Sequence, residues 1–317
     1  MPGRHHSGGG AGGCKEKSMT REFSVGIAAY NEAANIGRLL DRLLIYQRGD
    51  SGLSEILVVA SGCTDQTEPI VRSYAAKDHR VRLITEPRRR GKASAVNLFI
   101  GNSSNDLLVL MSADILPDEG ALELLVGPFA DDLVGVTAGR IIPQNDRASF
   151  MGFYVNLFWS LHHRIALKSF KAGEVVAFRR VFDAIPNDTA TDETWIVQLV
   201  QERGYFPQYI PQAVFRNRGP DNIRDFLKVR RRHLVGYHHL LKLRPDWKLP
   251  DTMNNLMVLG LLKDEMPASM KNVVLLTGSL LLELGARLLA WYDFHLAKRN
   301  PFVWDMAAST KDPEDRT

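Results

Sequence analysis

Between residues 22 and 114, short apolar runs alternate with segments in which apolar residues recur every three to four positions. Apolar runs predict strands just before Tyr30 and over 54–60 (SEILVVA), 81–86 (VRLITE) and 106–114 (DLLVLMSAD). Helical spacing predicts helices carrying Ile36 to Leu44 and over 64–77 and 91–104. Strands that are apolar throughout and alternate with helices predict βαβ units, in which a mostly parallel sheet is covered by helices on both faces.

Small and polar side chains follow three of these strands. Asn31 and Glu32 follow the first strand, Ser61 to Asp65 follow the second, and Asp114 ends the fourth. In α/β sheets of this kind, ligands bind beyond the carboxyl ends of the strands. The small residues of VVASGCTDQT would let a bulky ligand approach the backbone, so the sequence predicts a ligand crevice at this edge.

The second half of the chain is richer in helical, aromatic and basic patterns. Its most apolar segment, residues 272–294, has the length of a membrane span. However, Ser279, Glu283 and Arg287 recur every four residues and form a polar stripe along it. The stripe favours an amphipathic helix that packs on the domain, on a second subunit or on a membrane surface. A membrane span is the less favoured alternative.

Composition changes this picture little. Hydrophobic residues make up 45% and charged residues 24% of the 317 residues, as in ordinary globular proteins. The formal net charge of +4 is too small to indicate a nucleic-acid partner. The two cysteines, Cys14 and Cys63, imply no disulfide framework and fit a reducing, cytoplasmic compartment. Residues 1–20 are Gly-rich, lack the apolar core of a secretory signal and are predicted to form a disordered leader.

Motifs between roughly residues 22 and 240 carry a resemblance to a known family. They are AAYNEAANIGRLL, VVASGCTDQT, RRRGKASAVN, LVLMSADILPDEGAL, TDETWIVQLVQERGY and VRRRHLVG. In this order they resemble family 2 glycosyltransferases of the GT-A fold, which are nucleotide-sugar-dependent, usually inverting enzymes and include cellulose-synthase-like members. The resemblance implies a GT-A domain over 21–240, with a Rossmann-like, mostly parallel sheet flanked by helices. Residues 241–317 would then form a helical C-terminal region, associated with a membrane or with a second subunit.

The same resemblance implies a set of donor-binding residues. Those implied to bind the nucleotide-sugar are Ala29, Tyr30, Asn31, Glu32, Ser61, Asp65, Gly91, Lys92, Asn97, Ala113, Asp114 and Arg232. The family usually has two adjacent acids where this chain has Ala60 and Ser61, so the nucleobase is not predicted. Asp65 also suits the N-cap of the helix that follows, and both roles can hold at once.

The resemblance implies a divalent metal at Asp114. The segment Ser112–Asp114 stands where the family has Asp-x-Asp, and only the second acid is present. That acid normally coordinates Mg²⁺ or Mn²⁺ bridging the sugar diphosphate. The ion stabilises the charge that develops on the leaving diphosphate, and phosphate oxygens and water complete its ligands.

TDET, residues 191–194, matches the motif that supplies the general base. Counting back from Gly204 places Glu193 at the usual position of the catalytic acid, whereas the shorter and more rigid carboxylate at a helix entrance favours Asp192. Both remain candidates, beside the alternative that they only stabilise a helix N-terminus. A base here would take the acceptor's hydroxyl proton as that oxygen attacks opposite the diphosphate, which inverts the anomeric carbon.

Two further positions are implied on the acceptor side. Glu174 occupies the place of an acceptor-side loop. His233 stands where the family's Gln-x-x-Arg-Trp motif has tryptophan, and Val229 stands in place of its glutamine, while Arg232 is kept and suits phosphate oxygens. Loss of the tryptophan argues against processive polysaccharide synthesis.

The sequence therefore predicts inverting, metal-assisted sugar transfer from a nucleotide-sugar to an acceptor hydroxyl. The apolar helix suggests a lipid-linked or cell-envelope glycan acceptor, and a peripheral location at the inner face of the cell membrane or a homodimer. No nucleic-acid partner is expected, because the basic clusters fall on motifs that fit phosphate recognition. One alternative is a nucleotidyltransferase on the same fold, but AAYNEAANIG lacks the Gly-rich basic loop that such enzymes need. The other is a non-catalytic nucleotide-sugar-binding subunit, suggested by the altered acid pair and the reduced Asp-x-Asp.

Overall fold

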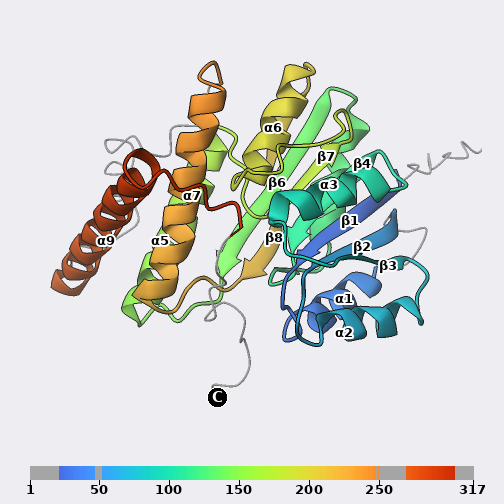
Figure 1. Ribbon diagram of the computed structural model, residues 1–317, viewed down its shortest axis with the longest axis horizontal. Helices are drawn as coiled ribbons and strands as arrows, with labels where there is room; N and C mark the ends of the chain where they lie inside the picture. The colour runs from blue at the N-terminus through green and yellow to red at the C-terminus, as the bar shows by residue number, and fades with distance from the viewer. Residues whose placement is uncertain (1–20, 47–51, 248, 250–268, 304–317) are drawn as a thin grey trace, which may run out of the picture.

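The structure is a computed structural model that describes residues 21–46, 52–247, 249 and 269–303 (Figure 1). The leader predicted over 1–20, including Cys14, lies outside the described residues. The strands are β1 (Phe23–Ala29), β2 (Leu53–Ser61), β3 (Val81–Glu86), β4 (Leu107–Ser112), β5 (Leu116–Pro117), β6 (Val134–Pro143), β7 (Val176–Arg179) and β8 (Phe206–Asn217). The helices are α1 (Ile36–Leu44), α2 (Thr67–Ala75), α3 (Lys92–Asn102), α4 (Ala121–Val126), η1 (Gly127–Ala130), α5 (Phe150–Lys168), α6 (Asp192–Glu202), α7 (Ile223–Leu243) and α9 (Met270–His295).

One sheet joins all these strands in the order β3-β2-β1-β4-β7-β6-β8-β5. Parallel pairs join β1 to β2 and β4, β2 to β3, and β6 to β8. β7 runs antiparallel to β4 and β6, and β5 runs antiparallel to β8. The mostly parallel α/β sheet flanked by helices is therefore confirmed, as are the strands and helices predicted in the first half.

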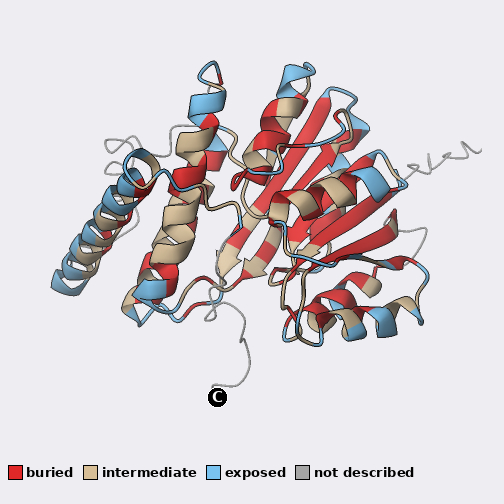
Figure 2. Ribbon diagram, viewed as in Figure 1, coloured by how far each residue is buried: buried red, intermediate tan, exposed pale blue. Residues whose placement is uncertain are grey.

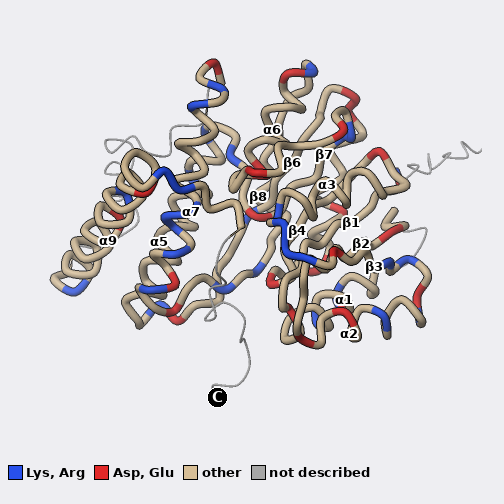
Figure 3. The backbone as a smooth tube through the Cα atoms, viewed as in Figure 1, with Lys and Arg blue, Asp and Glu red and all other residues tan. Residues whose placement is uncertain are grey.

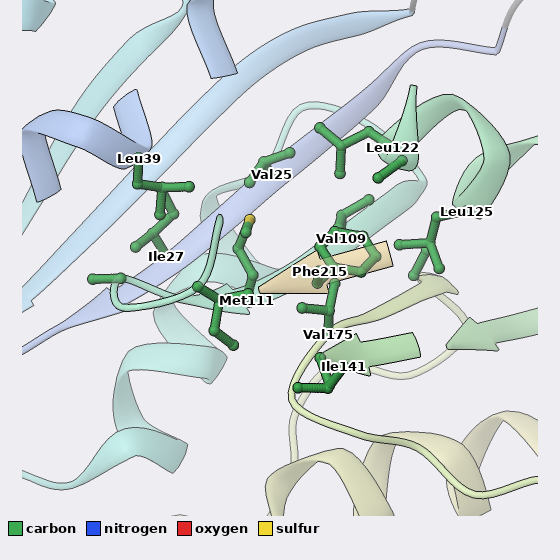
Figure 4. Packing of buried hydrophobic residues seen from close by; sticks show 14 of the residues in the cluster. Val25, Ile27, Leu39, Val109, Met111, Leu122, Leu125, Ile141, Val175 and Phe215 are labelled. Atoms are coloured by element: carbon green, nitrogen blue, oxygen red, sulfur yellow. The ribbon is translucent and has the colours of Figure 1, made fainter. Parts of the chain in front are cut away.

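The apolar strands pack on both faces because successive side chains point to opposite sides of a sheet. Val109 and Met111 of β4 face one core, with Val25 and Ile27 of β1, on the side covered by α1 (Figure 4). The neighbouring Leu108 and Leu110 face a second core, shared with α3 and α6. Burial on both faces explains why these strands lack alternating polar residues.

α9 packs on α5 and α7 through its predicted polar stripe. The Glu283 carboxylate accepts hydrogen bonds from the Arg230 guanidinium at 2.8 and 2.6 Å and from the Tyr154 hydroxyl at 2.9 Å. Ten residues further along, Asp293 accepts from Arg231 at 2.9 and 2.6 Å. The opposite side of α9 is largely exposed (Figure 2). Among the described residues, α9 is the one helix long and apolar enough to cross a membrane.

Replacing Glu283 by alanine should destabilise the contact between α9 and α7. The side chains of Arg230 and Glu283 are only 14% and 16% exposed, so the change leaves a buried guanidinium without its carboxylate. Removing one partner of a buried ion pair costs about 3 kcal/mol. Hydrogen exchange of the α7 and α9 amides should show a comparable loss in opening free energy. The control, Leu281→Ala at a 64% exposed position of α9, should change it little, and equal effects in both variants would contradict the expectation.

The segment that follows α9 returns across α7 toward the middle of the molecule (Figure 1). The carbonyl of Arg299 accepts a hydrogen bond from the His239 ring at 3.0 Å, and the Asn300 amide donates to the carbonyl of Asp188 at 3.1 Å. At Gly91, whose φ is +96°, an added Cβ would lie 2.7 Å from the carbonyl oxygen of Phe302. The described end of the chain thus packs against the loop that leads into α3.

Candidate active site

Side chains hold together the two turns that follow β1 and β2. Asn31, at φ +52°, accepts a hydrogen bond from the Thr64 amide at 2.8 Å. The Thr67 hydroxyl accepts from the Glu32 amide at 2.7 Å. The Asp65 carboxylate accepts from the amides of Ala33 and Thr67 at 3.1 and 3.0 Å. Asn31 and Asp65 therefore brace these turns.

A cavity of about 340 Å³ lies beyond the carboxyl ends of β1 and β4 and extends between α5 and α7. The predicted site residues that line it are Ala29, Tyr30, Glu32, Ser61, Gly91, Lys92, Asp114, Glu174, Asp192, Glu193, Arg232 and His233. The Lys/Arg run in the loop before α3 leads to this region (Figure 3). The fold thus brings Asp114 and the Asp192–Glu193 pair into one cavity.

Four predicted donor residues do not line this cavity. They are Asn31, Asp65, Asn97 and Ala113. The Asn97 amide donates to the Ile185 carbonyl at 2.8 Å and accepts from the Ile185 amide at 2.9 Å, so it anchors the loop before α6. Ala113 is buried beside Asp114 and borders a smaller neighbouring cavity. The amide contacts of Asn97 are made within the protein, and donor binding by these four residues stays a prediction.

Lys92 joins the start of α3 to the start of α6. Its Nζ lies 2.8 Å from Asp192 Oδ2 and 2.5 Å from Glu193 Oε1. Burial disfavours the ammonium, but the two carboxylates raise the pKa of Lys92 above its usual value. Burial, and then the charge of Asp192, raise the pKa of Glu193, against the opposing effect of Lys92. Glu193 is therefore a stronger base than an ordinary glutamate.

Arg232 marks the centre of the charged part of the cavity. Burial lowers the pKa of its guanidinium to about 10, while the charges of Asp192, Glu193, Glu174 and Asp114 act in the opposite direction. All four carboxylates thus lie within electrostatic range of one cation. The implied metal ligand and the candidate bases therefore share one cavity with this cation.

Arg232 also fixes the state of the neighbouring imidazole. Its Nη2 lies 3.0 Å from His233 Nε2. Burial, followed by the charge of Arg232, holds the pKa of His233 well below its usual range. Because arginine only donates hydrogen bonds, Nε2 is the acceptor and the ring proton resides on Nδ1. His233 is thus a neutral donor at neutral pH.

The surroundings of Asp114 fit a divalent cation. The Glu174 carboxylate accepts a hydrogen bond from Asn217 at 2.6 Å, and burial, then the charge of Asp114, raise the pKa of Glu174 to about 7. Two carboxyl groups that repel each other are oxygen ligands of the kind Mg²⁺ and Mn²⁺ take. No described residues form a group of three or more His, Cys, Asp or Glu able to hold a metal. Ligands other than these side chains, such as phosphate oxygens and water, would therefore have to complete a metal site at Asp114.

Other cavity-lining residues were not predicted from the sequence. The Arg89 guanidinium lies 3.8 Å from the centre of the Tyr30 ring, a cation–π contact at the end of the cavity beside β1. Further lining residues are Tyr154, Phe158, Trp159, Lys171, Arg218, Arg230 and Tyr237. The aromatic run in FYVNLFWS was the available signal for the first three, but nothing in that run indicated which side chains face a cavity.

Replacing Lys92 by methionine should shift the pH dependence of any reaction in which Glu193 acts as a base. The ammonium lowers the pKa of Glu193, so its loss raises that pKa further. A base must be ionised, and the acid limb of the pH–rate profile should therefore move to higher pH. Steady-state rates between pH 5 and 9 would show the shift, and Lys92→Arg should restore most of it. An unchanged acid limb in Lys92→Met would contradict the expectation.

The model of the family described as "Glycosyl transferase family 2" matches residues 24–186, about half of the chain. Dolichyl-phosphate β-glucosyltransferase of Mus musculus is 33% identical over 104 residues, which cover 31% of this chain and 32% of that protein. Poly-β-1,6-N-acetyl-D-glucosamine synthase of Staphylococcus aureus (strain COL) is 26% identical over 231 residues, which cover 68% of this chain and 54% of the synthase. The matches span about half or less of the length of these relatives.

Among solved structures, the chain resembles the mannosyltransferase PcManGT of Pyrobaculum calidifontis in complex with GDP-Man and Mn²⁺. The TM-score is 0.63 at 23% identity, with 89% of each chain covered. At that identity the likeness concerns the fold, and it agrees with the sheet described above. Together with the matched residues 24–186, which include β1 to β4 and the cavity residues that follow these strands, it confirms the resemblance found in the motifs. The chain belongs to glycosyl transferase family 2.

Proposed function

We propose that the chain transfers a sugar from a nucleotide-sugar to an acceptor hydroxyl with inversion, assisted by a divalent metal. The observation that carries this proposal is the gathering of Asp114, Glu174, Asp192 and Glu193 around Arg232 in one cavity. Acidic and basic groups that lie far apart in the sequence and meet in a cavity are typical of an active site. PcManGT, which shares the fold, was solved with GDP-Man and Mn²⁺.

The donor end of the cavity is suited to a sugar diphosphate. Arg89, Lys92 and Arg232 bring positive charge to it. Asp114 would hold Mg²⁺ or Mn²⁺ together with the diphosphate oxygens. When bound, the ion neutralises charge that develops on the departing diphosphate.

Glu193 is assigned as the general base in this proposal, in preference to Asp192. Burial and the charge of Asp192 raise its pKa, and its charge acts on Tyr237 and Glu174 on the acceptor side. Asp192 is more deeply buried, at 3% exposure. Glu193 would take the acceptor's hydroxyl proton while that oxygen bonds to the anomeric carbon and the bond to the diphosphate breaks.

The proposed acceptor is a lipid-linked or cell-envelope glycan, and the proposed location is the inner face of a cell membrane. Glu283 of the polar stripe pairs with Arg230 of α7, and Asp293 further along α9 pairs with Arg231. These contacts turn the apolar side of α9 outward. Apolar residues exposed on α9 include Val273, Val274, Leu281, Leu284, Leu288 and Trp291. A helix of this kind suits the membrane–water interface. The mouse relative is named for a phosphorylated lipid, dolichyl phosphate, which supports this choice.

A panel of UDP- and GDP-sugars incubated with the chain, Mn²⁺ and octyl glycosides tests the proposal. The expected result is release of nucleoside diphosphate from one donor, dependent on Mn²⁺ and increased by an acceptor. Binding of a nucleoside diphosphate without turnover of any donor would favour the non-catalytic subunit instead. Release of pyrophosphate from nucleoside triphosphates would favour a nucleotidyltransferase.

A further inference from the structure

The cavity has a second half, which lies between α5 and α7 and away from the strand ends. Its walls are mainly aromatic and aliphatic side chains. They include Val155, Phe158 and Trp159 of α5, and Phe226, Val229 and Tyr237 of α7. A donor whose sugar diphosphate occupies the end near Asp114 leaves this half of the cavity unfilled. The second half is therefore available to the acceptor.

Lys171, in the loop after α5, brings a positive charge to these apolar walls. The residue is half-buried and lines the cavity, and its Nζ lies 5.9 Å from the centre of the Tyr237 ring. Burial, and then the positive charge of Arg230, lower the pKa of Lys171 to about 7. Within the described part of the chain, no carboxylate contributes to that shift. The ammonium therefore lies in an electropositive and partly desolvated environment.

Other cations of the cavity differ from Lys171 because they are paired with carboxylates. Lys92 is paired with Asp192 and Glu193, and Arg230 is paired with Glu283. Those carboxylates compensate the cost of burying the positive charges. At Lys171 the aromatic ring of Tyr237, at 5.9 Å, is a weak substitute for a carboxylate. An anion bound there would compensate the charge as the carboxylates do elsewhere.

We propose that Lys171 is the centre of an acceptor subsite that binds an oxyanion joined to an apolar group. The acceptor would thus carry a phosphate, sulfate or carboxylate in addition to its reacting hydroxyl. Its oxyanion would contact the Lys171 ammonium, and its apolar part would lie along Val155, Phe226 and Val229. This inference rests on the proposed function, because it assigns the second half of the cavity to the acceptor.

Calorimetric titration of the full chain with octyl sulfate tests the subsite. Excess UDP and GDP with Mn²⁺ are present, so that the donor end is not available to the probe. Octyl β-glucoside serves as a neutral probe with the same chain, and sodium sulfate serves as an oxyanion without one. The variants are Lys171→Met, Lys171→Arg and, as a matched control, Lys168→Met at an exposed position in the last turn of α5.

The subsite predicts that Lys171→Met lowers the affinity for octyl sulfate by about tenfold or more, which is the usual effect of losing a charge-assisted contact. Lys171→Arg should retain most of that affinity, and Lys168→Met should leave it unchanged. The affinity for octyl β-glucoside should change less than twofold in every variant. Equal losses in Lys171→Met and Lys168→Met would overturn the proposal. Sodium sulfate binding as tightly as octyl sulfate would overturn the apolar part of it.

Turnover of the nucleotide-sugar panel by the same variants separates this inference from the proposed function. If the chain releases nucleotide but its affinity for octyl sulfate does not depend on Lys171, the subsite is overturned and the proposed function is not. Binding that depends on Lys171 in a chain that turns over no donor would support the subsite and count against the transferase. Circular dichroism and Lys171→Arg show whether a loss in Lys171→Met reflects misfolding.

Discussion

Replacing Asp114 by asparagine is expected to lower kcat/KM for sugar transfer by about 10³-fold, because a lost metal ligand removes several kcal/mol of transition-state stabilisation. Asparagine keeps the size of the side chain but removes the charge that would hold the metal with the diphosphate. Asp114 follows β4 directly and shares its cavity with Lys92 and Arg232. The Mn²⁺-dependent gain in nucleoside diphosphate affinity should disappear together with activity, and calorimetry with and without Mn²⁺ would measure it.

Asp118→Asn is the matched control for that variant. Asp118 lies four residues further along the chain and is paired with Arg216 at 2.8 Å, and it does not line the main cavity. Its replacement should change the rate of sugar transfer only a few fold, and the rate should still depend on Mn²⁺. An Asp114→Asn variant that kept both its turnover and its response to Mn²⁺ would exclude Asp114 as the metal ligand.

Replacing Glu193 by glutamine is expected to lower kcat by about 10²- to 10⁴-fold, the usual contribution of a general base. Glutamine has nearly the same shape and cannot take up the proton, so donor affinity should stay within a fewfold of the original. Pre-steady-state measurements of nucleotide release and nucleotide binding separate the two effects. The variant should also lack the acid limb that Glu193 gives the pH–rate profile.

The neighbouring carboxylate provides the comparison for this assignment. Asp192→Asn removes one of the two carboxylate charges paired with Lys92 and leaves Glu193 in place. Its activity should therefore fall less than that of Glu193→Gln. The reverse order, with Asp192→Asn inactive and Glu193→Gln active, would assign the base to Asp192.

The first half of the fold follows from local sequence patterns. Continuous apolar runs such as DLLVLM can be buried on both faces only as central strands of a covered sheet, and β4 occupies that place. The face of α1 formed by Ile36, Leu39, Leu40 and Leu43 is buried as its spacing predicts. Elements whose pattern is set by burial within one segment were therefore predictable.

Placement of individual side chains was predicted less well, because it depends on contacts between distant segments. Asn97 matched a donor-binding motif, yet its amide is used by the backbone of Ile185, 88 residues away. Within the basic run Arg230–Arg232, the resemblance implies phosphate contact for Arg232 alone and gives no partner for Arg230 and Arg231. In the structure Arg230 and Arg231 pair with Glu283 and Asp293 of α9, and Arg232 faces the cavity carboxylates. Neighbouring side chains on a helix point in different directions. Which of these arginines face α9 and which faces the cavity depends on where α9 packs.

The anomeric configuration of the product tests the central claim most directly. Proton NMR of the sugar transferred from an α-linked nucleotide-sugar to octyl β-glucoside, in the presence of Mn²⁺, distinguishes the two outcomes. If Glu193 deprotonates an acceptor that attacks opposite the diphosphate held at Asp114, the new linkage is β. An α-linked product would contradict a single displacement in this cavity.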